Sequence, residues 1–475
     1  MVFSSAIFLF VFFPLVFGTY HLIPGMKAKN LLLAIASVIF YAFGNPAYTL
    51  LLLASVICNY AFGCILSGGF SRRRAALAAA VVLNVGFLCV FKYLDFFIEN
   101  INAVTGLGLP LVGIALPVGI SFYTFQGMSY VIDVYRDRQM GSRSFSKLLL
   151  YISFFPQLVA GPIIKFHDIS PQLDSRVCTM EDTALGLRRF IVGLGKKLLI
   201  ANTMGYTADA VFALGESDMN AALAWTGAIC YTLQIYFDFS GYSDMALGLG
   251  RIFGLRFAEN FRYPYAACGI RDFWKGWHIS LTSWFREYLY IPLGGNRKGR
   301  LRTSLNKLIV FFTTGIWHGA SWTFVIWGMW HGLLSVLEDM KIIPVDKWKG
   351  SLLGRATGHV YTMLAVILGF VVFRADTLSQ AWLVISNMFT GFTMTAQQQI
   401  LTHQLCYPLF LFGMAGAFVL SLPVLPFFRE KAEKSGQTGR KLFEGASFVL
   451  GACLFVLCLL NLSSATYNPF IYFRF

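Results

Sequence analysis

The stretch GIWHGASWTFVIWGMWHG, residues 315–332, places two titratable histidines among apolar and aromatic side chains. His318 and His331 are each followed by glycine, which allows a substrate or a backbone to approach closely. A neutral imidazole can take a proton from a hydroxyl while that oxygen attacks an activated acyl group. The stretch therefore predicts either an acid–base site or a pair of packed core histidines.

The spacing of these histidines argues against both acting on one atom. They lie 13 residues apart, and on one continuous helix this is about 20 Å of rise, with the two side chains on different sides. Either Gly319 breaks the helix, or only one histidine reacts. We expect Trp317 and the nearby tryptophans to wall such a site with large apolar surfaces.

Two further segments carry polar groups in apolar surroundings. In QIYFDFSGYSDMALGLG, residues 234–250, the side chains are Asp238, Ser240, Tyr242 and Asp244. They are expected either to cap a helix that begins near Gly241 or to line a polar cavity. In DFWKGWHISLTSWFREYLYIPLGGN, residues 272–296, they are His278 and, about two turns later, Arg286 and Glu287. His278 has either a chemical role or an ordinary solvated position.

The chain lacks the motifs of several other chemistries. It has no Walker A loop, GxSxG elbow, HExxH pair or DxD-like metal site. Its nine cysteines show no ligand-like spacing, so we expect neither a metal nor a disulfide framework. Two interpretations remain from the residues alone: a membrane acyltransferase, or a polysaccharide or lipid transporter (or export-complex scaffold) that uses intramembrane His and Asp as a proton relay.

Composition identifies the environment of these residues as a membrane. The chain has 475 residues, 57% hydrophobic and 13% charged, whereas soluble domains are about one quarter charged. Its net charge of +15 fits basic loops that face anionic lipid better than nucleic-acid binding. We predict an all-α polytopic membrane protein with a retained N-terminal span, roughly ten to twelve crossings and additional re-entrant or interfacial helices.

Apolar segments recur along the whole chain. The predicted spans are 4–22, 30–45, 47–66, 76–95, 112–134, 148–164, 190–212, 221–238, 241–256, 305–318, 321–338, 358–374, 406–425 and 444–461. Basic loops follow the first, third and fifth spans, which predicts a cytoplasmic location for these loops and an N-terminus outside. Pro156, Gly161 and Pro162 predict a broken helix in FFPQLVAGPI, residues 154–163. The aromatic and basic segment 258–307 is expected along the membrane interface.

Several strings together resemble the membrane-bound O-acyltransferase family, in its bacterial branch of alginate O-acetyltransferase membrane subunits. They are MVFSSAIFLFVFFPL, LPVGISFYTFQGMSYVIDVYR, FFPQLVAGPI, YFDFSGYSDMALGLGRIFGLRFAENFRYPY, DFWKGWHISLTSWFREYLYIPLGGNRKG and WHGASWTFVIWGMWHG. They run in the family's order from residue 1 to about 340. The tail matches more loosely, with FVVFRAD as its best piece.

The resemblance implies one integral membrane domain, 1–475, with N-terminal spans (1–135), a motif-bearing core (148–340) and C-terminal spans (341–475). Helices would surround a central funnel or tunnel. The family's essential histidine falls on His318, and a second one, important in teichoic-acid D-alanylation relatives, falls on His278. Asp238, Ser240, Tyr242, Arg286, Trp317 and His331 are expected to line the substrate tunnel.

The resemblance also implies the reaction and its participants. An acyl group, expected to be acetyl, passes from a cytosolic thioester such as acetyl-CoA to hydroxyls of an exported cell-surface polysaccharide. No cofactor is expected to stay bound. The expected partners are an esterase-like extracytoplasmic protein with a nucleophilic serine, the polysaccharide and membrane lipid. The expected location is the bacterial inner membrane.

Overall fold

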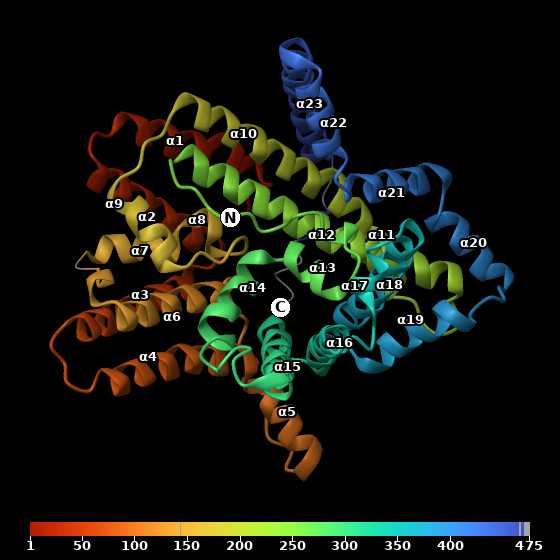
Figure 1. The fold of residues 1–475 in the computed structure, drawn as a ribbon, viewed down its shortest axis with the longest axis horizontal. Helices are drawn as coiled ribbons and strands as arrows, with labels where there is room; N and C mark the ends of the chain where they lie inside the picture. The colour runs from red at the N-terminus through yellow and green to blue at the C-terminus, as the bar shows by residue number, and fades with distance from the viewer. Residues whose placement is uncertain (143, 465–466, 470–475) are drawn as a thin grey trace. The chain divides into compact units, whose positions relative to one another are not determined.

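Helices are the regular elements of the computed structural model, which describes residues 1–142, 144–464 and 467–469 (Figure 1). Within this part of the chain there is no strand, as the sequence predicts. Among the described residues, five helical segments are long and apolar enough to cross a membrane: Met26–Gly44, Pro46–Ser67, Arg73–Thr105, Leu352–Arg374 and Gly436–Ser464. A sixth arises if two helices bent by 56° form one span. The protein is therefore a polytopic membrane protein, and the number of ten to twelve crossings stays a prediction.

The chain groups into two compact units, and the division into 1–135, 148–340 and 341–475 stays a prediction. The first contains Met1–Phe190, Tyr242–Glu259 and Ser283–Tyr288, and the second contains Ile191–Gly241, Asn260–Thr282 and Leu289–Phe475. Helices α10, α12 and α14 and the π-helical segment η6 each contain residues of both units.

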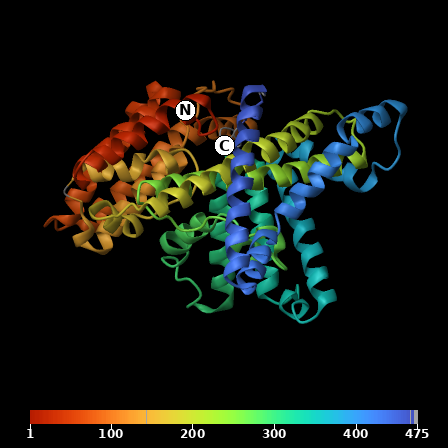
Figure 2. The same ribbon diagram turned by 90° about the horizontal axis from the view of Figure 1, so that it is seen from above.

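The first unit is built from the N-terminal helices. Its elements are η1 (Phe8–Phe12), α1 (Phe13–Leu22), α2 (Met26–Gly44), α3 (Pro46–Ser67), α4 (Arg73–Leu88), η2 (Cys89–Tyr93), α5 (Leu94–Thr105), α6 (Ile120–Arg136), η3 (Arg138–Met140), α7 (Phe145–Ser153), α8 (Phe155–Leu158), α9 (Phe166–Asp174) and most of α10 (Met180–Gly195). Helices α3, α4 and α6 lie side by side (Figures 1 and 2). Phenylalanines fill the core, and the rings of Phe12 and Phe155 meet edge to face with their centroids 5.3 Å apart.

Two segments of this unit, 112–134 and 154–163, test predictions made from the sequence. The span predicted at 112–134 is wrong in its first part, because residues 112–119 are not helical and α6 begins at Ile120. Residues 112 and 113 instead donate their backbone N–H groups to the Asp95 carboxylate, at 2.8 and 3.0 Å. The break predicted in FFPQLVAGPI is confirmed: α7 ends at Ser153, α8 is one short turn, and Gly161 has a φ of 109° that favours glycine.

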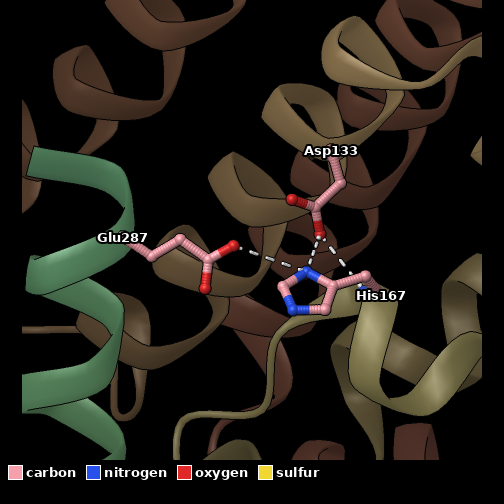
Figure 3. Close-up of side chains that lie close together, drawn as sticks. All are labelled: Asp133, His167 and Glu287. Carbon is pink, nitrogen blue, oxygen red and sulfur yellow. Dashed lines mark hydrogen bonds and ion pairs between the residues drawn. The ribbon is translucent and has the colours of Figure 1, made fainter. Parts of the chain in front are cut away.

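A network of ion pairs ties α6, α9 and η6 (Arg286–Tyr290) together in the first unit (Figure 3). The buried Asp133 carboxylate accepts from the His167 ring at 3.0 Å and from the Tyr288 hydroxyl at 2.8 Å. The other ring nitrogen of His167 lies 3.3 Å from Asp168, and Glu287 pairs with Lys165 at 2.8 Å. Both imidazole nitrogens therefore face carboxylates, and these hydrogen bonds raise the pKa of His167 to about 10.

The second unit contains the C-terminal half. Its elements are η4 (Lys196–Ala201), α11 (Asn202–Phe212), the first part of α12 (Ala221–Ile252), η5 (Pro264–Ala266), α13 (Ile270–Gly276), the start of α14 (Ile279–Phe285), α15 (Gly299–His318), α16 (Trp322–Asp339), α17 (Val345–Trp348), α18 (Leu352–Arg374), α19 (Leu378–Thr390), α20 (Ala396–Leu405), α21 (Pro408–Leu420), α22 (Val424–Lys434) and α23 (Gly436–Ser464).

Helix α12 corrects one sequence prediction. The two spans predicted at 221–238 and 241–256 form a single helix of 32 residues, so neither Asp238 nor Ser240 caps a helix at Gly241. Glycine serves close packing here, because a Cβ at Gly241 would lie 2.8 Å from the Gly193 carbonyl oxygen. Helical propensity and packing thus outweigh the cost of one internal glycine, which is about 1 kcal/mol.

Helices α15 and α16 form a tight antiparallel hairpin (Figure 1). The helix breaks at Gly319, whose backbone is extended, and Ser321 caps the start of α16. A Cβ at Gly319 would lie 2.1 Å from the Phe324 ring, and one at Gly315 would lie 2.5 Å from the Phe324 carbonyl oxygen. His318 is thereby the last residue of α15, at the turn of the hairpin, whereas His331 lies in the middle of α16.

The Glu338 carboxylate, fully buried near the end of α16, holds the start of α13. It accepts from the backbone N–H groups of Ile270 at 2.6 Å and Arg271 at 3.0 Å, and from the Arg271 guanidinium at 3.2 Å. These N–H groups lack partners within their own helix, and the carboxylate accepts their hydrogen bonds. The positive end of the helix dipole also stabilises its negative charge.

We expect Glu338→Ala to lower the free energy of unfolding by about 3 kcal/mol, because it leaves two helix N–H groups without their acceptor and removes one of the three carboxylates that pair with Arg271. Thermal unfolding of the purified protein measures the change. Glu430→Ala is the matched control, since it removes an exposed pair with Lys434 that contributes at most about 1 kcal/mol. Equal effects of the two substitutions would contradict the capping role.

The His167 network predicts a pH-dependent stability. A pKa of about 10 in the folded protein exceeds the unfolded value of about 6.5, so the stabilisation is complete below pH 6.5 and is lost as the pH rises toward 10. The difference in melting temperature between the wild type and His167→Gln should be largest near pH 6.5. This difference in melting temperature should decrease toward pH 10. A difference that does not change with pH would refute the stabilising role of protonated His167.

Candidate active site

His278 occupies a strained and buried position in the second unit. It stands between α13 and α14, its side chain is fully buried, and its φ of 43° lies in the left-handed region. Residues with a side chain rarely adopt this conformation, and such strain concentrates at functional sites. The backbone of the loop is held on both sides, by Arg262 N–H donating to the Gly276 carbonyl at 2.9 Å and Ile279 N–H donating to the Asn260 carbonyl at 3.0 Å.

The side chain of Asn260 fixes the imidazole of His278. Its Oδ1 lies 3.1 Å from His278 Nδ1 and accepts from the Ser280 backbone N–H at 3.2 Å and the Ser280 hydroxyl at 2.9 Å. Because a backbone N–H can only donate, the atom that faces it must be the amide oxygen of Asn260. An oxygen in turn requires a proton on His278 Nδ1, which leaves the lone pair of the neutral ring on Nε2.

The Nε2 atom of His278 is buried and has no hydrogen-bond partner among the residues that the structure describes. Aromatic rings lie next to this imidazole. The Phe239 ring meets it edge to face with the centroids 4.5 Å apart, and the centroid of the Trp317 ring lies 6.3 Å from it. A basic nitrogen in such a dry setting is available to a hydroxyl or thioester that enters the site.

His318 directly follows Trp317, whose ring centroid lies 6.3 Å from that of His278. Its own ring packs against Trp317 at 5.0 Å, Trp327 at 5.1 Å and Phe373 at 5.3 Å. The imidazole at the end of α15 is thus held by aromatic surfaces from three segments. The structure brings together His318, His278 and Trp317, all of which the sequence singles out, and their catalytic and lining roles stay predictions.

His331 has different surroundings. Its ring is fully buried between Phe273, stacked at 6.0 Å, Trp274 at 5.4 Å and Trp327 at 5.4 Å. A Cβ at Gly369 would lie 3.0 Å from its Nε2. The Trp327 ring lies against both His331 and His318, so these histidines share a wall.

The polar residues of α12 occupy two settings. Asp238 is 1% exposed and forms an ion pair of 2.9 Å with the buried Lys197. Ser240 is also buried, and its hydroxyl has no hydrogen-bond partner in the described chain. Because Phe239 between them contacts His278, this turn of α12 adjoins the histidine site.

Two of the residues expected to line a tunnel belong to the first unit. Tyr242 is buried and stacks on Phe3 with ring centroids 4.8 Å apart. Arg286 is exposed at the start of η6. Their lining role stays a prediction.

Sequence reasoning missed three residues that the site depends on: Asn260, Lys197 and Phe373. Asn260 is separated from His278 by 18 residues, and nothing in its local sequence marks it as an acceptor. Lys197 could be found from the sequence, because burying a lysine next to the apolar residues 198–201 costs free energy in a membrane unless the lysine has a partner. Phe373 belongs to FVVFRAD, but only the fold shows that it packs on His318.

One group of side chains in the described chain could offer three ligands to a metal: Asp133, His167 and Glu287 of the first unit. These ligands already have partners, because Tyr288 donates to Asp133, Lys165 donates to Glu287, and both ring nitrogens of His167 face carboxylates. A metal would have to displace a lysine and remove a proton from a strongly basic imidazole. The group is better described as an ion-pair network.

Comparison with known proteins agrees with this architecture. Residues 124–342 match the model of MBOAT, the membrane-bound O-acyltransferase family. The chain is 37% identical to a "Probable alginate O-acetylase" of Pseudomonas putida over the whole of both chains. It is 35% identical to a "Peptidoglycan O-acetyltransferase" of Helicobacter pylori, over 82% of this chain and 80% of that protein. A "Teichoic acid D-alanyltransferase" of Bacillus subtilis is 26% identical over 53% of this chain and 65% of its own length.

The matched region contains α12–α14 and the α15–α16 hairpin, and thus His278 and His318. A full-length relationship well above 30% identity leaves no alternative family. The chain belongs to the membrane-bound O-acyltransferase family, and it is an O-acyltransferase of the membrane.

Proposed function

We propose that the protein moves an acetyl group from a cytosolic thioester, acetyl-CoA, across the membrane toward hydroxyls of an exported cell-surface polysaccharide. The geometry of His278 is the observation that carries this proposal. Its Nδ1 is fixed by Asn260, its Nε2 has no hydrogen-bond partner among the described residues, and Trp317, the neighbour of His318 in the chain, lies 6.3 Å from its ring. Such an arrangement suits acyl transfer, which needs a base for a hydroxyl and no metal.

The reaction follows from this geometry. An acceptor hydroxyl attacks the carbonyl carbon of the thioester, and its proton passes to His318 as general base. His278 orients the reacting groups or shares the proton through Nε2. A C–O bond forms, the C–S bond breaks, and the proton ends on the departing thiol. The aromatic walls exclude water, which would otherwise hydrolyse the thioester.

The acceptor side of the proposal rests on the relatives. Two of them are named for O-acetylation of alginate and peptidoglycan, both of which are polysaccharides. We infer that an extracytoplasmic partner with a nucleophilic serine takes the acetyl group first and passes it to the polymer. The basic loops after the first, third and fifth predicted spans support an N-terminus outside, in the inner membrane of a bacterium.

His318→Ala should lower acetyl transfer by about 10²- to 10⁴-fold, the usual contribution of a general base, and His278→Ala should also impair it. The acetyl ester content of the polymer, measured by NMR at matched protein expression, reports the loss. His403→Ala, which removes an exposed histidine of α20, is the control and should leave acetylation unchanged. Full acetylation by His318→Ala would refute its role, and transport of substrate without thioester turnover would favour a transporter.

Asn260 should act as a positioning residue. Asn260→Ala removes the acceptor for Nδ1–H, so the imidazole can adopt the wrong tautomer, and kcat should fall by about 10- to 100-fold with little change in KM. Asn260→Asp keeps the acceptor and should retain more activity. Its pH profile should shift to higher pH, because a carboxylate favours the imidazolium. An unchanged kcat in Asn260→Ala would contradict the positioning role.

A further inference from the structure

Trp327 and Trp274 of the second unit each bury an indole N–H group that has no hydrogen-bond acceptor within the described part of the chain. The indole nitrogen can only donate, and a buried tryptophan usually finds an acceptor for it. Trp330 on the same helix as Trp327 does so, because its N–H donates to the Ala365 carbonyl at 2.9 Å. A buried donor without an acceptor costs free energy, and its retention points to a role outside folding.

The indole of Trp327 is fixed next to the His318 imidazole. The two ring centroids lie 5.1 Å apart, with the ring planes at 88°. Phe373 of α18 packs on both rings, at 4.8 Å from Trp327 and 5.3 Å from His318, and His331 lies 5.4 Å from the indole. Trp327 is only 1% exposed. Its N–H group therefore keeps one direction before any substrate enters, which is the property of a preorganised donor.

Glycines hold the backbone close to this indole. A Cβ at Gly369 of α18 would lie 3.5 Å from Trp327 Cδ1, the ring carbon bonded to Nε1, and 3.0 Å from His331 Nε2. On the other side, a Cβ at Gly328 would lie 2.4 Å from the Phe311 carbonyl oxygen, so α16 packs tightly on α15. Glycine at position 369 adds no side-chain acceptor at the pyrrole edge, and the N–H stays available to a ligand.

The acyl transfer proposed above creates a negative charge on the carbonyl oxygen of the thioester. When the hydroxyl oxygen attacks the carbonyl carbon, its proton passes to His318 and the π electrons of the C=O bond move onto the carbonyl oxygen. The oxyanion returns these electrons as the C–S bond breaks, and the departing thiolate takes the proton from His318. An N–H group aimed at this oxygen lowers the barrier, because the hydrogen bond strengthens as the charge develops.

We propose that the indole N–H of Trp327 donates to this oxyanion and makes Trp327 a further catalytic residue, an inference that rests on the proposed function. The attacking hydroxyl must lie within about 3 Å of the His318 nitrogen that takes its proton, and the carbonyl oxygen is two bonds further. A donor on a ring that contacts His318 can reach this oxygen. Trp274 packs instead against Trp327 at 5.8 Å and His331 at 5.4 Å, one ring further from His318.

Trp327→Phe tests this assignment, because it keeps an aromatic ring and removes the N–H group. We expect kcat to fall by about 10²- to 10³-fold, the usual effect of losing one oxyanion donor, with little change in the KM for acetyl-CoA. Trp274→Phe is the matched control, since it also removes a buried N–H without an acceptor, and it should keep the kcat of the wild type. Thiol release from acetyl-CoA by membranes of the native host, with each variant at matched expression, measures both constants.

A second replacement separates the lost donor from the lost ring volume. In 3-benzothienylalanine a sulfur atom takes the place of the indole N–H, and the bicyclic ring is kept. This residue at position 327 should lower kcat as much as Trp327→Phe does, while the melting temperature stays that of the wild type. Trp327→Phe and Trp274→Phe should lower the melting temperature by similar amounts, because both lose the same ring volume.

The possible outcomes are distinguishable. A wild-type kcat in both replacements of Trp327, together with a loss in His318→Ala, would overturn the role of Trp327 and leave the proposed function standing. An equal loss of kcat in Trp274→Phe would indicate a packing effect and overturn it as well. A loss in Trp317→Phe with none in Trp327→Phe would assign the donor to Trp317 instead. No thiol release by the wild type would overturn the proposed function and this inference with it.

Discussion

The hydrogen bond between Asn260 and His278 determines what the buried imidazole can do. A neutral histidine carries its proton on one of two nitrogens, and in a dry interior the partner of one nitrogen decides the state of the other. The Asn260 oxygen, itself identified by the Ser280 N–H, holds the proton on Nδ1. Nε2 consequently faces the aromatic site as a base, which is the property that acyl transfer needs.

The surrounding elements keep this small arrangement in place. The backbone pairing of 260–262 with 276–279 closes the loop, and the buried Glu338 anchors the helix that enters it. Glycine contacts let α15 and α16 pack closely, which places His318 at the turn of their hairpin. The left-handed conformation of His278 is strained, and the hydrogen bonds and packing around it offset that cost.

The sequence predicts the helical membrane architecture well, because this architecture rests on composition and on apolar strings that persist locally, whereas the roles of the histidines stay predictions. It predicts the contacts poorly. Asn260 and Phe373 act through tertiary packing that no local pattern reveals. Gly241 illustrates the opposite error: glycine near polar residues indicates a break, yet in α12 it allows the close approach of the Gly193 carbonyl. The same residue type breaks the helix at Gly319, so only the neighbours distinguish the two uses.

Direct determination of the His278 tautomer tests the central claim. Solid-state ¹⁵N NMR of the histidine-labelled protein in lipid, with His278→Gln used to assign the signal, distinguishes a protonated from an unprotonated ring nitrogen. We expect a neutral His278 at pH 7 with the proton on Nδ1 and a bare Nε2. A proton on Nε2, or a fully protonated ring at that pH, would contradict it.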